Sequence, residues 1–366
     1  MSFRIAVIGA GWYGCHIALA FTSLGMQVDV FEKNDRPLHC ASGNNQFRLH
    51  LGFHYARHHG TRVQSRDGFI RFIERYPTLS AEIPQNIYAV PRETSLIDFQ
   101  TYKLIMVSSG LNFVEAENFK QLLHNVEGIM LTNERVLLID RARRYFLDSL
   151  RNSLHFGHKI DSVQDLGHHI LVNGKTYDYV VDATWGHRDG LHVPVYYEPT
   201  LLLYYETSQH IPAITFVDGP LSSIYPTEDP NIYTLSSVIH TPLGRFSKAG
   251  LACERLNEVD AALVSSKRQA MEAQISQNFP AFRDYFRFMG IQLSAKTKPV
   301  GNFDDRSCYV YQKGRLFTVL SGKIDTIFFA TERILSLIEA SNAKIPVPET
   351  PGIKNDILVP DGLSVA

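Results

Sequence analysis

The apolar and polar positions near the start of the chain predict a strand, a helix and a second strand in close succession. Residues 5–8 form a continuous apolar run, which is typical of a strand buried on both faces of a parallel sheet. Apolar residues then recur at helical spacing up to Leu24, and Gly25 follows as a C-terminal cap. Residues 27–32 are predicted to form the second strand, which ends at Glu32.

The same patterns predict a mixture of helices and strands over the rest of the chain. Residues 33–60 are polar and rich in Gly, Asn and His, and a loop of that length is usually functional. Helices are predicted at residues 69–76, 96–108, 141–154, 256–278 and 281–288, with a last helix that ends near residue 340. Strands are predicted at residues 87–90, 112–115, 128–132, 158–163, 169–172, 179–183, 200–207, 214–217, 221–225, 232–240 and 314–320, with a hairpin turn at Asn173 and Gly174.

Gly9, Gly11 and Gly14 lie between the first strand and the first helix at the spacing of a dinucleotide-binding motif. Gly9 permits the tight turn, Gly11 lets the backbone approach a pyrophosphate, and Gly14 lets helix and strand pack closely. The pyrophosphate would bind the unpaired N–H groups at the positive end of the helix. Glu32 would accept hydrogen bonds from a ribose diol, and an acid at this position argues against the 2′-phosphate of NADP.

These patterns predict an α/β protein with a Rossmann-like nucleotide-binding domain and an interleaved α+β substrate domain on a mainly antiparallel sheet. The strands after residue 193 alternate only partly, as expected for an antiparallel sheet with one covered face. We expect the nucleotide-binding domain to comprise residues 1–75, 130–192 and 300–345. The substrate or cap domain would comprise residues 76–129 and 193–299, and residues 346–366 an irregular tail.

Composition narrows the class of protein further. The chain has 366 residues, of which 45% are hydrophobic and 20% charged, and a net charge of −1, so it lacks the basic surface that binds nucleic acid or acidic lipid. Its four cysteines have no CxxC spacing, which argues against a disulfide framework or a zinc site. Because no apolar run reaches membrane-spanning length and the first strand begins near residue 3, we expect no signal peptide and a cytoplasmic protein.

Three further segments stand out beside the glycine motif. They are the loop at residues 41–55, the strand and turn at residues 177–186, and the strand-to-helix turn at residues 320–325. Together with the glycine motif they resemble the FAD-dependent oxidoreductases of the D-amino-acid oxidase superfamily, which have a glutathione-reductase-type FAD domain. The second segment is similar to the family's second FAD motif, although Trp185 here interrupts the usual Thr-Gly ending.

The resemblance implies a set of FAD contacts. The loop at 41–55 would run along the flavin ring, Val163 in the strand at 158–163 would contact the adenine, and the turn at 320–325 would lie beside the isoalloxazine. The implied cofactor-binding residues are Gly9, Gly11, Trp12, Tyr13, Gly14, Glu32, Lys33, Ser42, Asn45, Gln46, Arg48, Val163, Ala183, Thr184, Trp185, Ser321, Gly322, Lys323 and Ile324. We expect non-covalent FAD; Cys308 and His50 are the candidates for a covalent link, but a buried inert cysteine is commoner.

Candidate catalytic residues follow from the chemistry of a flavin. Negative charge develops on the ring when it accepts a hydride, and Lys323 at a helix start could stabilise that charge. Oxidation of an alcohol needs a base for the hydroxyl proton, and His50 and His54 titrate in the right range. A metal site at His54, His58 and His59 is disfavoured because no acid or fourth ligand is placed to complete it.

Candidate substrate-binding residues lie in the same loop and in the second domain. Arg48 or Arg57 would bind a carboxylate through two parallel hydrogen bonds, with Arg48 also counted among the catalytic residues. Tyr55, together with Tyr225 and His240 at predicted strand ends, could line the substrate pocket. Core packing is an equally good interpretation of Tyr225.

We therefore expect an FAD-dependent oxidoreductase that oxidises a C–N or C–O bond of an amine, amino acid or hydroxy acid by hydride transfer. Its partners would be that small polar substrate and an electron acceptor such as oxygen. The alternatives are an FAD monooxygenase with a nicotinamide reductant, a flavin-binding protein without turnover, and an NAD-dependent dehydrogenase. The last is disfavoured because the segments at 177–186 and 320–325 would have no role in it.

Overall fold

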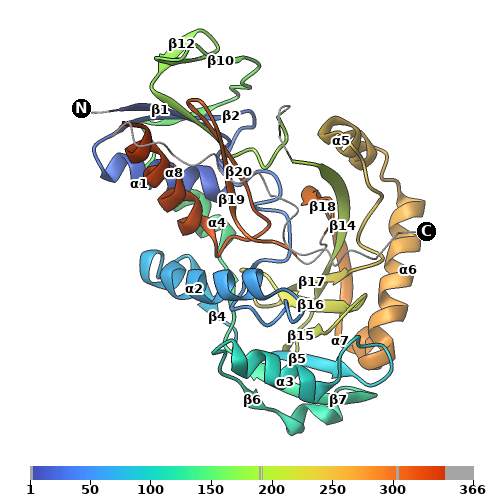
Figure 1. Ribbon diagram of the computed structural model, residues 1–366. Coiled ribbons are helices and arrows are strands. Elements are labelled where there is room, and N and C mark those ends of the chain that lie inside the picture. The colour runs from blue at the N-terminus through green and yellow to red at the C-terminus, as the bar shows by residue number, and fades with distance from the viewer. Residues whose placement is uncertain (1–2, 189–190, 192, 302–304, 343–366) are drawn as a thin grey trace, which may run out of the picture.

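A six-stranded sheet forms the first of two large layers in the computed structural model, which describes residues 3–188, 191, 193–301 and 305–342 (Figure 1). The strand order is β19-β20-β13-β1-β2-β9, parallel except for the antiparallel edge strand β19. The strands are β1 (Arg4–Ile8), β2 (Gln27–Glu32), β9 (Leu154–Phe156), β13 (Tyr179–Asp182), β19 (Tyr309–Lys313) and β20 (Leu316–Leu320). They come from three distant parts of the chain.

Both faces of this sheet are covered, which explains why its central strand is continuously apolar. Ile5 and Val7 face a core shared with the helices α1 (Trp12–Ser23), α2 (His59–Arg75), α4 (Ile139–Ser149) and α8 (Ile327–Asn342). Ala6 and Ile8 face a smaller core under a three-stranded antiparallel sheet. That sheet consists of β10 (Val163–Asp165), β11 (Ile170–Val172) and β12 (Lys175–Tyr177).

An eight-stranded sheet, mainly antiparallel, forms the second layer. The strand order is β18-β14-β17-β16-β15-β5-β7-β6, and only the β15–β5 pair within it is parallel. The strands are β5 (Asn86–Pro91), β6 (Val114–Glu115), β7 (Val126–Thr132), β14 (Val195–Glu206), β15 (Ala213–Phe216), β16 (Ser222–Pro226), β17 (Ile232–Ser237) and β18 (Arg287–Pro299).

The two faces of the second sheet differ in polarity. One face carries Leu203, Ile224 and Leu235, which pack against Met271 and Ile275 of the long helix α6 (Ala261–Asn278). The opposite face carries polar side chains of β16 and β17 and meets the loop at residues 41–55. The remaining elements are β3 (Arg48–Leu49), β4 (Ser80–Glu82), β8 (Arg135–Leu137), α3 (Phe99–Ser108), the 3-10 helix η1 (Glu117–Gln121), α5 (Ala249–Asn257) and α7 (Phe282–Tyr285).

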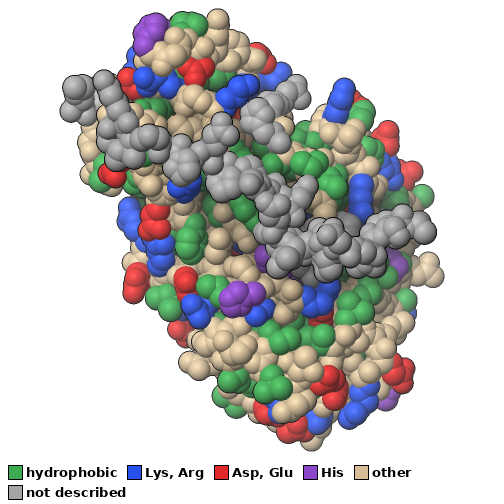
Figure 2. Space-filling view, in the orientation of Figure 1, with side chains coloured by type: hydrophobic (Ala, Val, Ile, Leu, Met, Phe, Trp, Pro, Cys, Tyr) green, Lys and Arg blue, Asp and Glu red, His purple; other side chains and the backbone are tan. Residues whose placement is uncertain are grey.

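The surface agrees with the near-zero net charge. Figure 2 shows Lys and Arg side chains interspersed with Asp and Glu over the visible face. Among the helices that the structure describes, none is both long and apolar enough to cross a membrane.

The α/β class and the first βαβ unit are confirmed, and the structure corrects several other elements. Residues 281–288 are not one helix: α7 has four residues, and β18 begins at Arg287. Phe282 and Phe286 have the spacing of a helix, but their rings are buried because both pack in an aromatic cluster beneath the sheet. The strand predicted at 158–163 was also wrong, since β10 begins at Val163, and the helix predicted at 141–154 ends at Ser149. The limits of the two domains remain a prediction.

The contact between α1 and the loop before it yields a prediction about stability. A Cβ on Gly14 would lie 1.8 Å from the Gly9 carbonyl oxygen, so the backbone would have to move. We expect Gly14→Ala to lower the free energy of unfolding by about 3 kcal/mol. Gly250→Ala, in open space on α5, serves as control and should leave it unchanged or raise it by up to about 1 kcal/mol. Equal denaturant midpoints for both variants would contradict the close packing.

Candidate active site

Two adjoining cavities lie at the carboxyl ends of β1, β2 and β13. The Glu32 cavity is lined by residues that include Gly9, Glu32, Lys33 and Thr184. The Lys323 cavity is lined by residues that include Asn45, Arg48, His50 and Lys323. The two share five lining residues, namely Gly11, Ala41, Ser42, Ala183 and Trp185, so together they form one path past the start of α1.

The start of α1 leaves backbone donors available between the two cavities. Its N-cap residue, Gly11, has an extended backbone and no side-chain hydrogen bond to the first turn. Ser42 Oγ accepts a hydrogen bond from the Trp12 amide at 3.2 Å. Unpaired amides at a positive helix end form a binding site for an anion such as a diphosphate.

Glu32 connects the glycine loop to the loop that follows β2. Its buried carboxylate accepts hydrogen bonds from the Ala10 amide at 2.9 Å and from the amide and side chain of Asn34 at 3.0 and 2.6 Å. Glu32 therefore links the glycine loop to the loop after β2, beside the cavity residues Gly9, Gly11 and Lys33.

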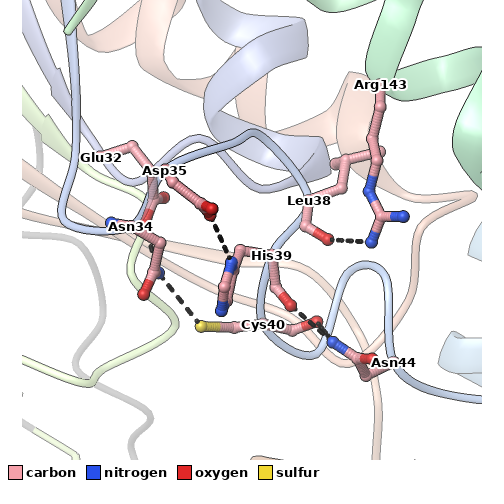
Figure 3. Close-up of polar contacts among 8 residues, drawn as sticks. All are labelled: Glu32, Asn34, Asp35, Leu38, His39, Cys40, Asn44 and Arg143. Atoms are coloured by element: carbon pink, nitrogen blue, oxygen red, sulfur yellow. Dashed lines mark hydrogen bonds and ion pairs between the residues drawn. The ribbon is translucent and has the colours of Figure 1, made fainter. Parts of the chain in front are cut away.

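The loop after β2 is folded on itself by polar contacts (Figure 3). The Asn44 side chain donates to the carbonyl oxygens of His39 and Cys40, at 2.5 and 2.9 Å. Arg143 of α4 donates to the Leu38 carbonyl at 3.1 Å, which attaches the loop to the helical layer. Further along, Gln46 donates to carbonyl oxygens of β16 and β17, so the same loop also contacts the second sheet.

Lys323 is a buried lysine in the wall of the second cavity. Its ammonium lies 4.2 Å from the centre of the Tyr55 ring, and its carbonyl accepts a hydrogen bond from the Tyr13 hydroxyl at 2.6 Å. Burial lowers the pKa of Lys323 and raises that of Asp325 two residues later. Helix α2 packs so closely here that a Cβ on Gly68 would lie 1.9 Å from the Asp325 carbonyl oxygen.

Arg48 presents unsatisfied donors at the same cavity. One of its terminal nitrogens donates to Thr215 Oγ1 at 2.5 Å, and its guanidinium lies 4.1 Å from the centre of the Tyr225 ring. Its Nε and Nη2 are buried and have no hydrogen-bond partner among the described residues. A buried guanidinium with two open donors is matched by a ligand that brings acceptor atoms.

Two histidines of the 41–55 loop lie beside these cations. His50 lines the Lys323 cavity, and burial together with Lys323 lowers its pKa to about 4. His54 is packed 5.8 Å from His50, ring centre to ring centre, and burial lowers its pKa well below the usual value. Both are therefore neutral at pH 7, and a neutral imidazole can accept a proton.

Most of the residues predicted from the sequence line one or both cavities. In the Glu32 cavity are Gly9, Gly11, Glu32, Lys33, Ser42, Ala183, Thr184 and Trp185. In the Lys323 cavity are Gly11, Trp12, Tyr13, Ser42, Asn45, Gln46, Arg48, His50, Ala183, Trp185, Ser321, Gly322, Lys323 and Ile324. That these residues hold the cofactor remains a proposal.

Other predicted residues line neither cavity, and Gly14 is one of them because it packs against the Gly9 carbonyl. Val163 belongs to β10, and Ile160, three positions earlier, lies in the Glu32 cavity instead. Tyr225 is wholly buried beneath Arg48, and His240 lies in the turn after β17. From the sequence alone, the alternation of side chains near a strand end does not show which face of the sheet Tyr225 and His240 would occupy. His54 and Tyr55 lie behind the cavity wall beside His50 and Lys323.

Three further candidates have other contacts in the structure. Arg57 forms an ion pair with Asp218. His58 caps α2, where its Nδ1 accepts a hydrogen bond from the Thr61 amide at 3.0 Å. Burial raises the pKa of Cys308 to about 12, so its thiol is protonated at neutral pH.

Sequence reasoning missed Glu134, His158, Lys159 and His187. The last three line the Glu32 cavity. The sequence signal that could have found them is their position: His158 and Lys159 follow β9, and His187 follows the turn at Trp185. Glu134 lies between β7 and β8 in a polar stretch of the sequence that carries no motif. The structure places it fully buried beside His50.

Comparison with known proteins identifies the class. The family FAD dependent oxidoreductase (DAO) matches residues 4–289. The FAD-dependent monooxygenase FPY4 of Fusarium mangiferae is 56% identical over 335 residues, which cover 92% of this chain and 91% of that protein. The FAD-dependent monooxygenase kojA of Aspergillus flavus is 26% identical over 92% of this chain and 85% of its own length.

Solved structures show the same fold. Glycine oxidase from Geobacillus kaustophilus superimposes with a TM-score of 0.71 at 14% identity, covering 92% of this chain and 95% of that one. L-alpha-glycerophosphate oxidase from Mycoplasma pneumoniae, with FAD bound, gives 0.71 at 9% identity over 93% and 95%. The chain belongs to the FAD dependent oxidoreductase family: it is an FAD-dependent oxidoreductase, and its cofactor is FAD.

The residues present fit that cofactor. The open start of α1 suits a diphosphate, and the Glu32 carboxylate at the end of β2 suits a ribose. Among the residues that line the Lys323 cavity, Arg48 has two buried nitrogens, Nε and Nη2, with no acceptor in the part of the chain that the structure describes. Acceptor atoms of a ligand would satisfy such donors.

The contacts of Glu32 predict its effect on cofactor affinity. Glu32→Ala removes the acceptor that links the glycine loop to the loop after β2, so we expect the dissociation constant of FAD to rise by about 10- to 100-fold. Titration of apoprotein with FAD, followed by tryptophan fluorescence or calorimetry, measures this. Glu74→Ala, an exposed glutamate on α2, is the control. If Glu32→Ala binds FAD as tightly as the control variant does, Glu32 does not contribute to the cofactor site.

Proposed function

We propose that this protein takes a hydride from the carbon bearing a hydroxyl or amino group of a small polar substrate. The observation that supports this most directly is that three side chains line one cavity. They are Arg48, with two unpaired donors among the described residues, His50, which is neutral at pH 7, and the buried Lys323. When bound, the flavin supplies the two-electron acceptor for that hydride.

In this proposal the Glu32 cavity holds the nucleotide part of FAD. The amides at the start of α1 bind the diphosphate, Glu32 accepts from the ribose, and Ile160 takes the adenine contact first assigned to Val163. The turn at Ser321, Gly322, Lys323 and Ile324 lies beside the ring. Lys323 carries positive charge to a place where the reduced cofactor carries negative charge.

The residues proposed to bind the substrate line the same Lys323 cavity. His50 accepts the hydroxyl proton, which an alcohol must lose as its carbon is oxidised. Arg48 binds an anionic group of the substrate through its two open nitrogens, while Thr215 and Tyr225 keep its guanidinium in place. The role of Arg48 uses two nitrogens that have no hydrogen-bond partner among the described residues.

A second candidate function is monooxygenation. The observation in its favour is that FPY4 and kojA, which both match over nine-tenths of this chain, are named FAD-dependent monooxygenases. Such a reaction needs oxygen and an external reductant, with a nicotinamide the usual source of electrons.

Anaerobic reduction of the bound flavin separates the two functions. We expect hydroxy acids or amines to bleach the visible flavin band without any nicotinamide, because the substrate itself provides the electrons. The measurement is the absorbance spectrum of the holoenzyme under argon with each compound in turn. Bleaching by NADPH but by none of these substrates would favour the monooxygenase and contradict the proposal.

The open donors of Arg48 predict a selective loss of substrate binding. For a substrate carrying a carboxylate, Arg48→Met should lower kcat/KM by about 100-fold, with most of the change in KM. Arg48→Lys keeps the charge but not the paired donors, and we expect a loss of about tenfold. The exposed Arg92→Met is the control. Unchanged KM in both Arg48 variants would show that Arg48 does not bind the substrate.

A further inference from the structure

Glu134 is a buried carboxylate whose position is set by the pairing of two short strands. β3 and β8 run antiparallel, with Arg48 opposite Val136 and Leu49 opposite Arg135. Continuing that register places Glu134 opposite His50, the next residue in the loop. The strand pairing, and not a flexible surface contact, therefore brings this carboxylate to a residue of the cavity wall.

Hydrogen bonds fix the carboxylate in one orientation. One oxygen accepts from the Leu51 amide at 2.8 Å, and the other accepts from the Tyr88 hydroxyl at 2.7 Å. The first oxygen also lies 3.7 Å from Nδ1 of His50. Although burial alone would raise the pKa of Glu134, His50 and these two hydrogen bonds lower it to about 2, so it is ionised at neutral pH.

A packing role alone does not account for this charge. Glu134 is fully buried, and among the residues that the structure describes His50 is the one basic side chain within 4 Å of it. Its neighbour Arg135 pairs instead with Glu82 and Ser80. A buried carboxylate without a permanent cation beside it costs stability, and such groups are concentrated at functional sites.

The contact with Glu134 also distinguishes the two nitrogens of His50. Nδ1 is buried and has no hydrogen-bond partner within 3.5 Å among the described residues, and the nearest anion to it is Glu134. Since His50 lines the Lys323 cavity, Nε2 is the nitrogen that can meet a substrate. An anion beside Nδ1 favours the tautomer with the proton on Nδ1 and leaves the Nε2 lone pair open.

We propose that Glu134 is a positioning residue that holds His50 with Nδ1 protonated and Nε2 as the acceptor, and that the group oxidised is therefore a hydroxyl. This inference rests on the proposed function. The hydroxyl proton passes to Nε2, the carbon-bound hydrogen leaves with its electron pair to the oxidised flavin, and the C–O single bond becomes a carbonyl. A neutral amine would need no such base, because its nitrogen lone pair is already free.

The pH dependence follows from the groups that face His50. Burial, Lys323 and Arg48 disfavour its protonation and Glu134 favours it, while the rings of His54 and Tyr55 pack beside it. Flavin reduction by an alcohol should fall as the pH drops toward about 4, where wild-type His50 takes up a proton. Glu134→Gln removes the charge that raises this pKa, so the fall should move to lower pH, with a lower rate on the plateau.

The tautomer can be measured without any substrate. Nitrogen-15 NMR of histidine-labelled holoenzyme at pH 7, with His50 assigned from His50→Gln, should show Nδ1 protonated and Nε2 bare. In Glu134→Gln we expect a mixture of tautomers. Glu82→Gln, an exposed carboxylate on the neighbouring strand β4, is the control and should match wild type. A wild-type His50 protonated on Nε2, or the same tautomer in Glu134→Gln, would overturn the proposal.

Matched substrate pairs test the reacting group. Anaerobic stopped-flow reduction is measured with hydroxy and amino acids of one skeleton, such as lactate and alanine or mandelate and phenylglycine. We expect the hydroxy member to be the better reductant, and Glu134→Gln to slow it by about 10- to 100-fold. Faster reduction by the amino members would contradict a hydroxyl substrate. If no compound reduces the flavin, the proposed function fails, while the NMR result still decides the role of Glu134.

Discussion

The close approach of α1 to the end of β1 is the constraint on which the site depends. Because Gly14 has no side chain, the helix packs directly against the Gly9 carbonyl, and its first turn faces the path between the two cavities. Tyr13, in the same turn, donates a hydrogen bond to the Lys323 carbonyl near the other end of the chain. One helix start therefore positions both the amides that we propose bind the diphosphate and the turn that carries the buried lysine.

The second sheet completes the site from the opposite side. Its polar face meets the 41–55 loop, where Gln46 bonds to the backbone of β16 and β17 and Arg48 bonds to Thr215. Arg48 and Lys323 lie in the cavity wall, whereas Glu134 lies beside His50. In the proposed function, Arg48 and Lys323 face the ligands, and the Glu134 carboxylate lies next to the histidine that we propose it orients.

The parts of the site that could be predicted are those with a local sequence signal. Gly9, Gly11, Gly14 and Glu32 have a fixed spacing because one βαβ unit builds them, and apolar runs marked the strands that are buried on both faces. The loop and the last turn could be assigned through their resemblance to a family, which depends on several short motifs in order.

The missed parts depend on contacts between distant segments. Glu134 is brought to His50 by the pairing of two- and three-residue strands, which leave almost no periodicity to detect. β18 was hidden because phenylalanines at helical spacing precede it. Val163 does not line the Glu32 cavity, because the chain between β9 and β10 forms no strand.

A crystal structure of the protein with FAD bound would test the central claim most directly. The account predicts diphosphate density within hydrogen-bond distance of the amides at the start of α1, and a flavin ring between Arg48, His50 and the turn at Lys323. Density for the diphosphate elsewhere, or a ring outside the Lys323 cavity, would contradict it.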